Sequence, residues 1–220
     1  MEPDNPLLDQ YILRQARREK PRVCFIGTAS GDAPGYIDRF YQSFGKLPCE
    51  PSHLSLFKAP EGSLENFVLE KDIVYVGGGN TRNLLVLWRE WGLDRILRQA
   101  LEEGVVLCGL SAGSICWFEE GVTDSVPGRL TALHGLGFLA GSHCPHYDGE
   151  VKRRPAYHRL IAGKEVIGGY AADDGTALHF IDGALRHIVS SRPDARAYRV
   201  SLRDEAVVEE ILPPRYLGAA

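Results

Sequence analysis

The 220-residue sequence lacks the features that place a protein in a membrane or on nucleic acid. Its apolar runs all fall short of the ~20 residues that a helix needs to span a bilayer. The first residues contain no basic stretch followed by an apolar one, so we expect no secretion signal. Lysine and arginine form no long block, and the formal net charge is −4. We therefore expect neither a membrane nor a nucleic acid as a partner.

Cysteine pairs are also lacking. The five cysteines are dispersed, no two of them form a C-x-x-C motif, and their odd number does not suit a disulfide framework. Three of the five lie in apolar runs, where buried thiols are common. This usage is typical of a reducing compartment and predicts a cytoplasmic location.

What is present in the first half is an alternation of strand and helix patterns. Short apolar runs at 22–26, 73–76 and 105–108 predict buried strands. Apolar residues at helical spacing over 36–44 and 84–91 predict helices between them. Strands and helices that alternate through short links are typical of a parallel sheet covered by helices. The fold class is therefore α/β.

The second half has a weaker pattern. Residues 119–149 are rich in Gly, Pro, Asp and His and have no clean period, so they are expected to be irregular. A strand is predicted at 165–170 and a β-hairpin with an Asp-Gly turn at 177–189. The runs at 198–202 and 207–212 are predicted to be edge strands. No linker or repeat interrupts the chain, which predicts a single domain over residues 1–220.

The segment 105–118 contains Gly-x-Ser-x-Gly between an apolar run and small residues. This order predicts a strand, a tight turn and a helix, with Ser111 exposed on the turn as a nucleophile. A helix starting there would point its first N–H groups, including that of Ala112, at an oxyanion formed beside the serine. The alternative is a serine that merely caps an ordinary helix.

Three glycines at 77–79 follow a buried strand. A flexible turn would explain them, whereas a nucleotide loop is disfavoured because the spacing matches neither G-x-G-x-x-G nor a P-loop. A backbone that approaches a ligand closely would explain them as well. The amide of Gly78 or Gly79 could then join that of Ala112 in an oxyanion hole. The following Asn80 is a candidate substrate contact.

A serine nucleophile needs a base, and two of the seven histidines lie in the polar segment Gly-Ser-His-Cys-Pro-His. His143 and His146 flank Cys144-Pro145, and the proline would stiffen the placement of His146. A metal site of His and Cys is the rival interpretation, but a fourth ligand at a recognisable spacing is missing. Neither a metal nor a cofactor is predicted.

A carboxylate should orient the base by accepting a hydrogen bond from its other ring nitrogen. Asp174 follows the predicted strand at 165–170, at a carboxyl end where α/β sheets place their sites. Asp124 lies shortly after the serine motif. Each could instead be a turn residue or a helix cap.

The four motifs in this order, Gly-Gly-Gly-Asn-Thr, Gly-Leu-Ser-Ala-Gly, Pro-His and Asp-Gly, resemble the peptidase E family of serine peptidases. The resemblance runs from about residue 22 to about residue 183. It implies a Rossmann-like three-layer sandwich of class I glutamine amidotransferase type, with a mostly parallel central sheet and helices on both faces. The C-terminal hairpin and edge strands complete this expected fold.

The resemblance also implies roles: Ser111 is the nucleophile, His146 is the base, and amides of the glycine stretch and Ala112 bind the oxyanion. The family's acidic partner matches Asp174, although the best-known member has Glu there, and Asp124 is retained as the second candidate. Aspartyl dipeptidases of this family hold the substrate's acidic side chain with an arginine. Arg153 and Arg154 lie at a comparable separation from the histidine.

These expectations describe a cytoplasmic serine peptidase that acts on short peptides, with dipeptides and an N-terminal aspartate as the candidate substrates and a homodimer as a candidate assembly. Three rivals remain. One is a catalytically silent relative that binds a small ligand, and another is a short esterase. The third, a glutamine amidotransferase, would need Cys at position 111, whereas Cys108 and Cys116 lie on either side of it.

Overall fold

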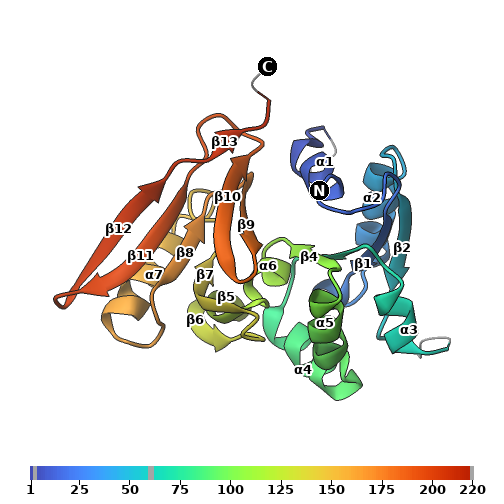
Figure 1. Cartoon of the computed structure of the whole chain (residues 1–220). Helices are drawn as coiled ribbons and strands as arrows, with labels where there is room; N and C mark the ends of the chain where they lie inside the picture. Colours follow the sequence, from blue (N-terminus) through green and yellow to red (C-terminus); the bar gives the residue numbers. More distant parts are fainter. Residues whose placement is uncertain (2–3, 59–61, 219–220) are drawn as a thin grey trace. The chain divides into compact units, whose positions relative to one another are not determined.

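The computed structural model describes residues 1, 4–58 and 62–218 (Figure 1). Its contacts divide the chain into two compact units, Met1–Gly113 and Ser114–Ala220. Each unit is described by itself below, as the first unit and the second unit.

The first unit contains a four-stranded sheet in which every pairing is parallel, in the order β2-β1-β3-β4. The strands are β1 (Arg22–Ile26), β2 (Glu50–Leu54), β3 (Ile73–Val76) and β4 (Val106–Gly109). This confirms the predicted parallel sheet. Since Val76 pairs with Gly109, the glycine stretch and the serine motif leave the sheet from adjacent strand ends.

Helices lie on both faces of this sheet, as the parallel arrangement requires. They are α1 (Leu7–Leu13), η1 (Thr28–Ser30), α2 (Pro34–Phe44), α3 (Leu64–Leu69), α4 (Thr81–Trp91) and α5 (Leu93–Glu102). Phe40 and Phe44 of α2 pack with Phe25 and Tyr75 of the sheet in one apolar core. Cys24 and Ile26 of β1 and Val74 and Val76 of β3 are also fully buried. Helices α4 and α5 lie beside each other, and α5 lies next to β4 (Figure 1).

The second unit contains a mixed six-stranded sheet in the order β12-β11-β8-β7-β5-β6 and a small sheet in the order β13-β10-β9. Its strands are β5 (Phe118–Val126), β6 (Arg129–His134), β7 (Leu139–Cys144), β8 (Gly169–Ala172), β9 (Thr176–Ile181), β10 (Ala184–Ser190), β11 (Ala197–Arg203), β12 (Ala206–Leu212) and β13 (Arg215–Tyr216). Among the described strands of the second unit, only the pairings of β5 with β7, β7 with β8 and β10 with β13 are parallel.

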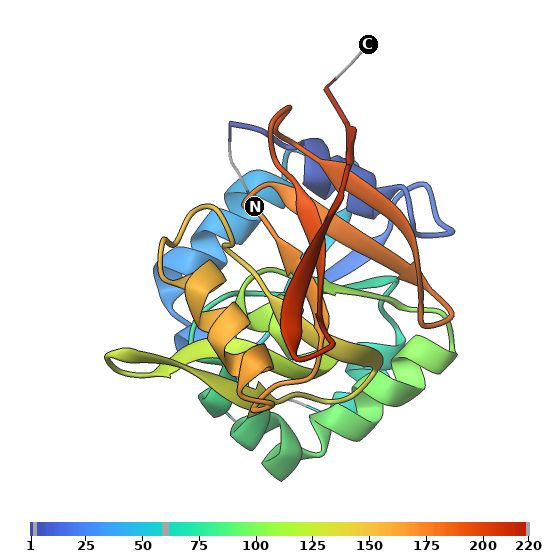
Figure 2. The same cartoon turned by 90° about the vertical axis from the view of Figure 1, so that its left-hand side faces the viewer.

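Helix α7 (Arg153–Ala162) covers one face of the larger sheet (Figure 2). Its Tyr157 and Leu160 pack with Val122, Cys144 and Val200 of the strands in a separate apolar core. The predicted hairpin is confirmed: β9 and β10 are antiparallel, and Asp182 and Gly183 between them have φ of 51° and 73°.

Three expectations for the second half were wrong. Residues 119–149 are not irregular, because they form most of β5 and all of β6 and β7. Small and polar residues interrupt the apolar alternation of these strands and hide them. The strand predicted at 165–170 begins only at Gly169, since the N–H of Ile167 donates to the Glu120 carboxylate instead of a strand. Lastly, β11 is not an edge strand, because it lies between β8 and β12.

The helix after the serine motif is also shorter than the sequence indicates. Helix α6 (Ala112–Ile115) is a single turn, and β5 starts at Phe118. The dipole of a long helix therefore does not act at Ser111.

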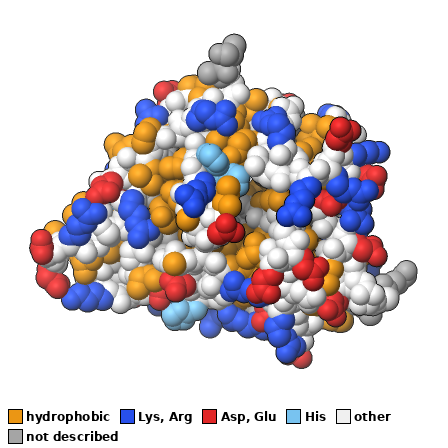
Figure 3. Space-filling model, in the orientation of Figure 1, with side chains coloured by type: hydrophobic (Ala, Val, Ile, Leu, Met, Phe, Trp, Pro, Cys, Tyr) orange, Lys and Arg blue, Asp and Glu red, His pale blue; other side chains and the backbone are white. Residues whose placement is uncertain are grey.

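The α/β class with a parallel sheet, helices and additional edge strands is confirmed. Among the described residues, no helix combines the length and the apolar composition that crossing a membrane requires. The face shown in Figure 3 carries acidic and basic side chains interspersed with apolar ones.

Candidate active site

Ser111 stands at the turn where β4 passes into α6 in the first unit. Its φ of 54° lies in the left-handed region, which costs a residue with a side chain about 1–3 kcal/mol. The turn is closed by two hydrogen bonds: Leu110 N donates to Val76 O at 3.1 Å, and Gly113 N donates to Leu110 O at 2.9 Å. This strained strand-to-helix turn is the local geometry that the Gly-x-Ser-x-Gly pattern predicts.

The two glycines of the motif are required by close approaches of the backbone. A Cβ at Gly109 would lie 2.3 Å from Gly113 O and 2.8 Å from Val76 O. A Cβ at Gly113 would lie 2.3 Å from Val76 O. Since real Cβ atoms do not approach backbone oxygens this closely, any side chain at either position would force the turn apart.

The glycine stretch 77–79 lies against this turn. A Cβ at Gly78 would lie 3.1 Å from Ser111 Cβ, so the backbone of Gly78 is next to the serine. Gly79 has a φ of 137°, and a Cβ there would lie 2.2 Å from Ala29 O. These close approaches are made to the protein's own Ala29 and Ser111, and they explain the glycine at position 79 better than a flexible turn does.

Two residues predicted in this part of the site have local partners. The Gly78 N–H donates to the hydroxyl of Tyr36 at 3.0 Å. The side chain of Asn80 accepts a hydrogen bond from Asn83 N at 3.0 Å and caps the N-terminus of α4. The capping bond alone explains why asparagine is favoured at position 80.

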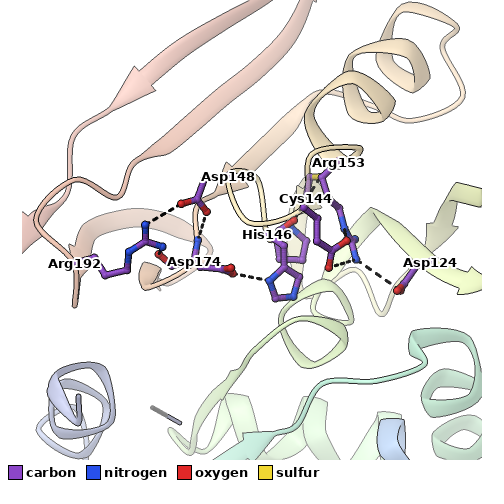
Figure 4. Close-up of polar contacts among 9 residues, drawn as sticks. Asp124, Cys144, His146, Asp148, Arg153, Asp174 and Arg192 are labelled. Carbon is purple, nitrogen blue, oxygen red and sulfur yellow. Dashed lines mark hydrogen bonds and ion pairs between the residues drawn. The ribbon is translucent and has the colours of Figure 1, made fainter. Parts of the chain in front are cut away.

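In the second unit, His146 and Asp174 form a short hydrogen bond, with Nδ1 of the imidazole 2.6 Å from Oδ1 of the carboxylate (Figure 4). His146 follows the end of β7, and Asp174 follows the end of β8. These two strands pair in parallel, so both residues follow strand ends at the same end of the sheet. The side chains are 26% and 44% exposed, which leaves the pair accessible to solvent.

Two further residues hold the turn that carries Asp174 (Figure 4). Asp148 accepts a hydrogen bond from Asp174 N at 2.8 Å. Arg192 donates to Asp174 O at 3.0 Å and to Asp148 Oδ2 at 3.1 Å. In addition, a Cβ at Gly149 would lie 2.2 Å from Asp174 Oδ2, so a side chain at position 149 would displace the carboxylate. The sequence interpretation missed both Asp148 and Arg192.

The second candidate carboxylate, Asp124, lies on β5 and points to Arg153, with 3.7 Å between the charged atoms (Figure 4). Arg153 itself is 1% exposed, and it donates to Val122 O and to the Glu150 carboxylate, each at 2.8 Å. These surroundings favour a structural role for Arg153 within the second unit.

Arg154 forms an ion pair with Glu209 of β12 and lies over the rings of Tyr147 and Tyr198. Its side chain is 51% exposed, so it is the more accessible of the two predicted specificity arginines. It shares Glu209 with His158.

His143 has a different environment from His146. It lies on β7, its ring stacks on Phe118 with centroids 5.0 Å apart, and Nδ1 is 3.2 Å from Tyr170 O. Burial lowers the pKa of His143 to about 4, so the ring is neutral at physiological pH. Among the described residues, no group of three or more His, Cys, Asp or Glu side chains is arranged to hold a metal ion.

The model of peptidase family S51 matches residues 1–188. The chain belongs to peptidase family S51.

Its relatives carry peptidase names as well. The S51 chain is 64% identical to the peptidase YgaJ of Bacillus subtilis (strain 168) over 218 residues, which are 99% of this chain and 94% of the relative. It is 24% identical to the peptidase Lmo0363 of Listeria monocytogenes over 151 residues, covering 65% and 72% of the two chains. The resemblance to the peptidase E family is thus confirmed.

A solved structure shows the same fold. A peptidase from an acI-B1 Actinobacterium superposes with a TM-score of 0.69 at 18% identity, over 96% of this chain and 89% of that one.

Each unit of this S51 peptidase thus holds one part of the predicted machinery. The first unit places Ser111 on a strained turn against the glycine stretch, and the second places a carboxylate on the Nδ1 side of His146. A strained serine and an oriented imidazole are the components that acyl transfer by a serine nucleophile requires.

Proposed function

We propose that this S51 peptidase is a serine peptidase that hydrolyses short peptides, with Ser111 as nucleophile, His146 as general base and Asp174 as the carboxylate that orients the base. The observation that carries the proposal is the 2.6 Å bond between His146 Nδ1 and Asp174 Oδ1. A carboxylate at Nδ1 fixes the tautomer in which Nε2 is free to accept a proton.

The reaction follows from these roles. His146 Nε2 takes the proton of Ser111 Oγ as the oxygen attacks the scissile carbonyl, and the imidazolium is stabilised by Asp174. His146 then gives the proton to the leaving amine, and an acyl-enzyme forms. Water, deprotonated by the same imidazole, releases the acid and restores the serine.

The oxyanion of this proposal is held by the backbone amides of Gly79 and Ala112. The Gly78 amide was the third candidate, but it already donates to Tyr36. Among the described hydrogen bonds, none uses the amide of Gly79.

The choice of Asp174 over Asp124 rests on the partners of the two carboxylates. Asp174 accepts from the histidine, whereas Asp124 faces the guanidinium of Arg153. A charge already compensated by arginine is poorly placed to stabilise an imidazolium.

For the substrate we propose dipeptides. A preference for an N-terminal aspartate would depend on Arg154, because Arg153 is buried. An exposed guanidinium can bind a carboxylate with two parallel hydrogen bonds, although here it also pairs with Glu209.

The test is a hydrolysis screen of Asp-Leu, Ala-Leu and Leu-Leu with the wild type and matched variants. We expect Ser111→Ala to lose activity by about 10⁴-fold or more and Asp174→Asn by about 10³–10⁴-fold. Asp124→Asn is the matched control and should stay within about threefold of wild type, since it removes only an exposed partner of Arg153. Wild-type rates in Ser111→Ala would refute the role of Ser111 as nucleophile. A larger loss in Asp124→Asn than in Asp174→Asn would assign the orienting role to Asp124 instead of Asp174.

A further inference from the structure

Tyr36 lies in the first turn of α2, and its ring is fixed by contacts on several sides. It packs edge-on against Phe25 with centroids 5.1 Å apart. A Cβ at Gly77 would lie 3.1 Å from Tyr36 Cε1, so the ring lies directly against the glycine stretch. The hydroxyl accepts the hydrogen bond from Gly78 N at 3.0 Å. The phenol is therefore held in one orientation.

The glycine that orients Tyr36 is also the glycine that contacts the nucleophile. Gly78 lies between Tyr36 and Ser111. Its nitrogen is 3.0 Å from the Tyr36 hydroxyl, and a Cβ built on it would lie 3.1 Å from Ser111 Cβ. Adding these steps to standard bond lengths places Tyr36 Oη within roughly 9 Å of Ser111 Cβ. All three residues belong to the first unit. A carbonyl group bonded to Ser111 Oγ, with its oxygen hydrogen-bonded to the phenol, spans a distance of this order.

The phenolic proton is available to a ligand. A tyrosine hydroxyl has one proton to donate and can accept as well. Here the acceptor side is used by Gly78, and within residues 4–58 and 62–218 no acceptor for the Tyr36 proton is found. Burial raises the pKa of Tyr36, although the bond from Gly78 opposes the shift, so the phenol keeps its proton at neutral pH. Accepting the amide hydrogen also polarises the O–H bond and makes it a better donor.

We propose that Tyr36 is a further catalytic residue, whose O–H donates a hydrogen bond to the substrate oxygen that becomes negatively charged when Ser111 attacks. The Gly78 amide then acts on the oxyanion through the phenol instead of directly. This inference rests on the serine-peptidase function proposed above. It adds a side-chain donor to the amides of Gly79 and Ala112.

The test measures how fast Ser111 reacts with diisopropyl fluorophosphate, which needs no knowledge of the natural substrate. Ser111 Oγ forms a bond to phosphorus, fluoride leaves, the serine proton passes to the base, and the phosphoryl oxygen occupies the oxyanion position. The rate is followed by intact-protein mass spectrometry. We expect Tyr36→Phe to react about 10- to 100-fold more slowly than wild type, the loss typical of one oxyanion donor.

Tyr41→Phe is the matched control, because Tyr41 lies on the same helix but bonds its hydroxyl to His53. Its labelling rate should stay within about twofold of wild type. Labelling of Tyr36→Phe at the wild-type rate would overturn the role of Tyr36 while leaving the proposed function intact. If wild-type Ser111 were not labelled at all, both proposals would fall together.

A second variant covers the case in which Tyr36→Phe disturbs the glycine stretch, seen as a melting temperature clearly below that of Tyr41→Phe. Tyrosine replaced by 3-fluorotyrosine at position 36 keeps the ring and the acceptor for Gly78 but donates a stronger hydrogen bond. At pH 6, where this phenol is neutral, labelling faster than wild type supports the proposal. An unchanged or slower rate overturns it.

Discussion

The two units hold their functional residues in place by different physical means. In the first unit the backbone itself sets the geometry: Gly109 and Gly113 pass so close to carbonyl oxygens that no side chain fits, and Ser111 takes a left-handed φ of 54° between them. In the second unit His146 is held by a hydrogen bond to Asp174, and the turn that carries Asp174 is held in turn by Asp148 and Arg192.

This difference has consequences for how each half can fail. A steric turn is rigid and insensitive to solvent, but a single added methyl group breaks it. A polar network tolerates changes of size and depends instead on its partners and on pH. The following predictions separate the two cases, from the largest expected effect to the smallest.

The tightly packed serine turn of the first unit is tested by Gly113→Ala. The added Cβ would lie 2.3 Å from Val76 O, so the turn or β3 must move, and we expect a loss of about 3 kcal/mol or more in the free energy of unfolding. Gly35→Ala is the matched control, because a Cβ there meets nothing within 4 Å. It lies in α2, where alanine is the better helix former, so it should be neutral or stabilise by up to about 1 kcal/mol. Urea denaturation measures both, and equal stabilities would contradict the steric account.

The polar network of the second unit is tested by Arg192→Gln, which removes the hydrogen bonds to Asp148 and to the Asp174 carbonyl. With the carboxylate less firmly placed, kcat for a cleaved dipeptide should fall about 10- to 100-fold while KM changes little. Arg203→Gln is the control, since Arg203 forms an exposed ion pair with Glu210 at 2.7 Å.

The same variant shows whether Arg192 works as a positioning residue through Asp174. If it does, adding Arg192→Gln to Asp174→Asn should cause no further loss, since the carboxylate that it positions is already gone. Independent, additive losses would show that Arg192 acts on something else.

The smallest effect concerns pH and the buried His143. The pKa of His143 is about 4 in the folded protein and 6.5 in the unfolded chain. Between these two pH values the unfolded chain therefore binds a proton that the folded protein does not bind. Stability is therefore fully present above pH 6.5 and is lost as the pH falls toward 4. Between pH 7 and 5 the wild type should lose about 2 kcal/mol of its free energy of unfolding through this site. The His143→Gln variant should lack this part of the loss.

His134→Gln is the control, with a side chain that is 85% exposed. It should follow the wild-type stability curve from pH 7 to pH 5. A His143→Gln protein that loses stability in acid as steeply as wild type would show that His143 does not carry this dependence.

The comparison of the units also explains what could be predicted from the sequence. The strands β1 and β3 are apolar runs that are buried almost throughout, and β4 is an apolar run that is only half-buried. Such runs are readable without a structure. The glycine requirements of the serine turn are local, since they involve the motif and one neighbouring strand end. Its residues therefore stand out as a motif.

The second unit was harder to predict because its geometry depends on distant partners. Arg192 reaches Asp148 across 44 residues, and nothing in the segment around either residue indicates the other. Strand β7 ends in Gly-Ser-His-Cys, where Ser142 is buried because its hydroxyl bonds to Tyr157 and Ile167 O. The composition of this strand resembles a loop, and only the sheet and α7 around it make it a strand.

The central claim is that Ser111 is a nucleophile activated by His146, and one measurement tests it most directly. Wild type, His146→Gln and His134→Gln are each treated with diisopropyl fluorophosphate, and the modified residue is located by peptide mass spectrometry. The account predicts a single phosphoryl group on Ser111 in wild type and in His134→Gln, and at least about a 10³-fold slower reaction in His146→Gln. Modification at another residue, or equal rates in all three proteins, would contradict it.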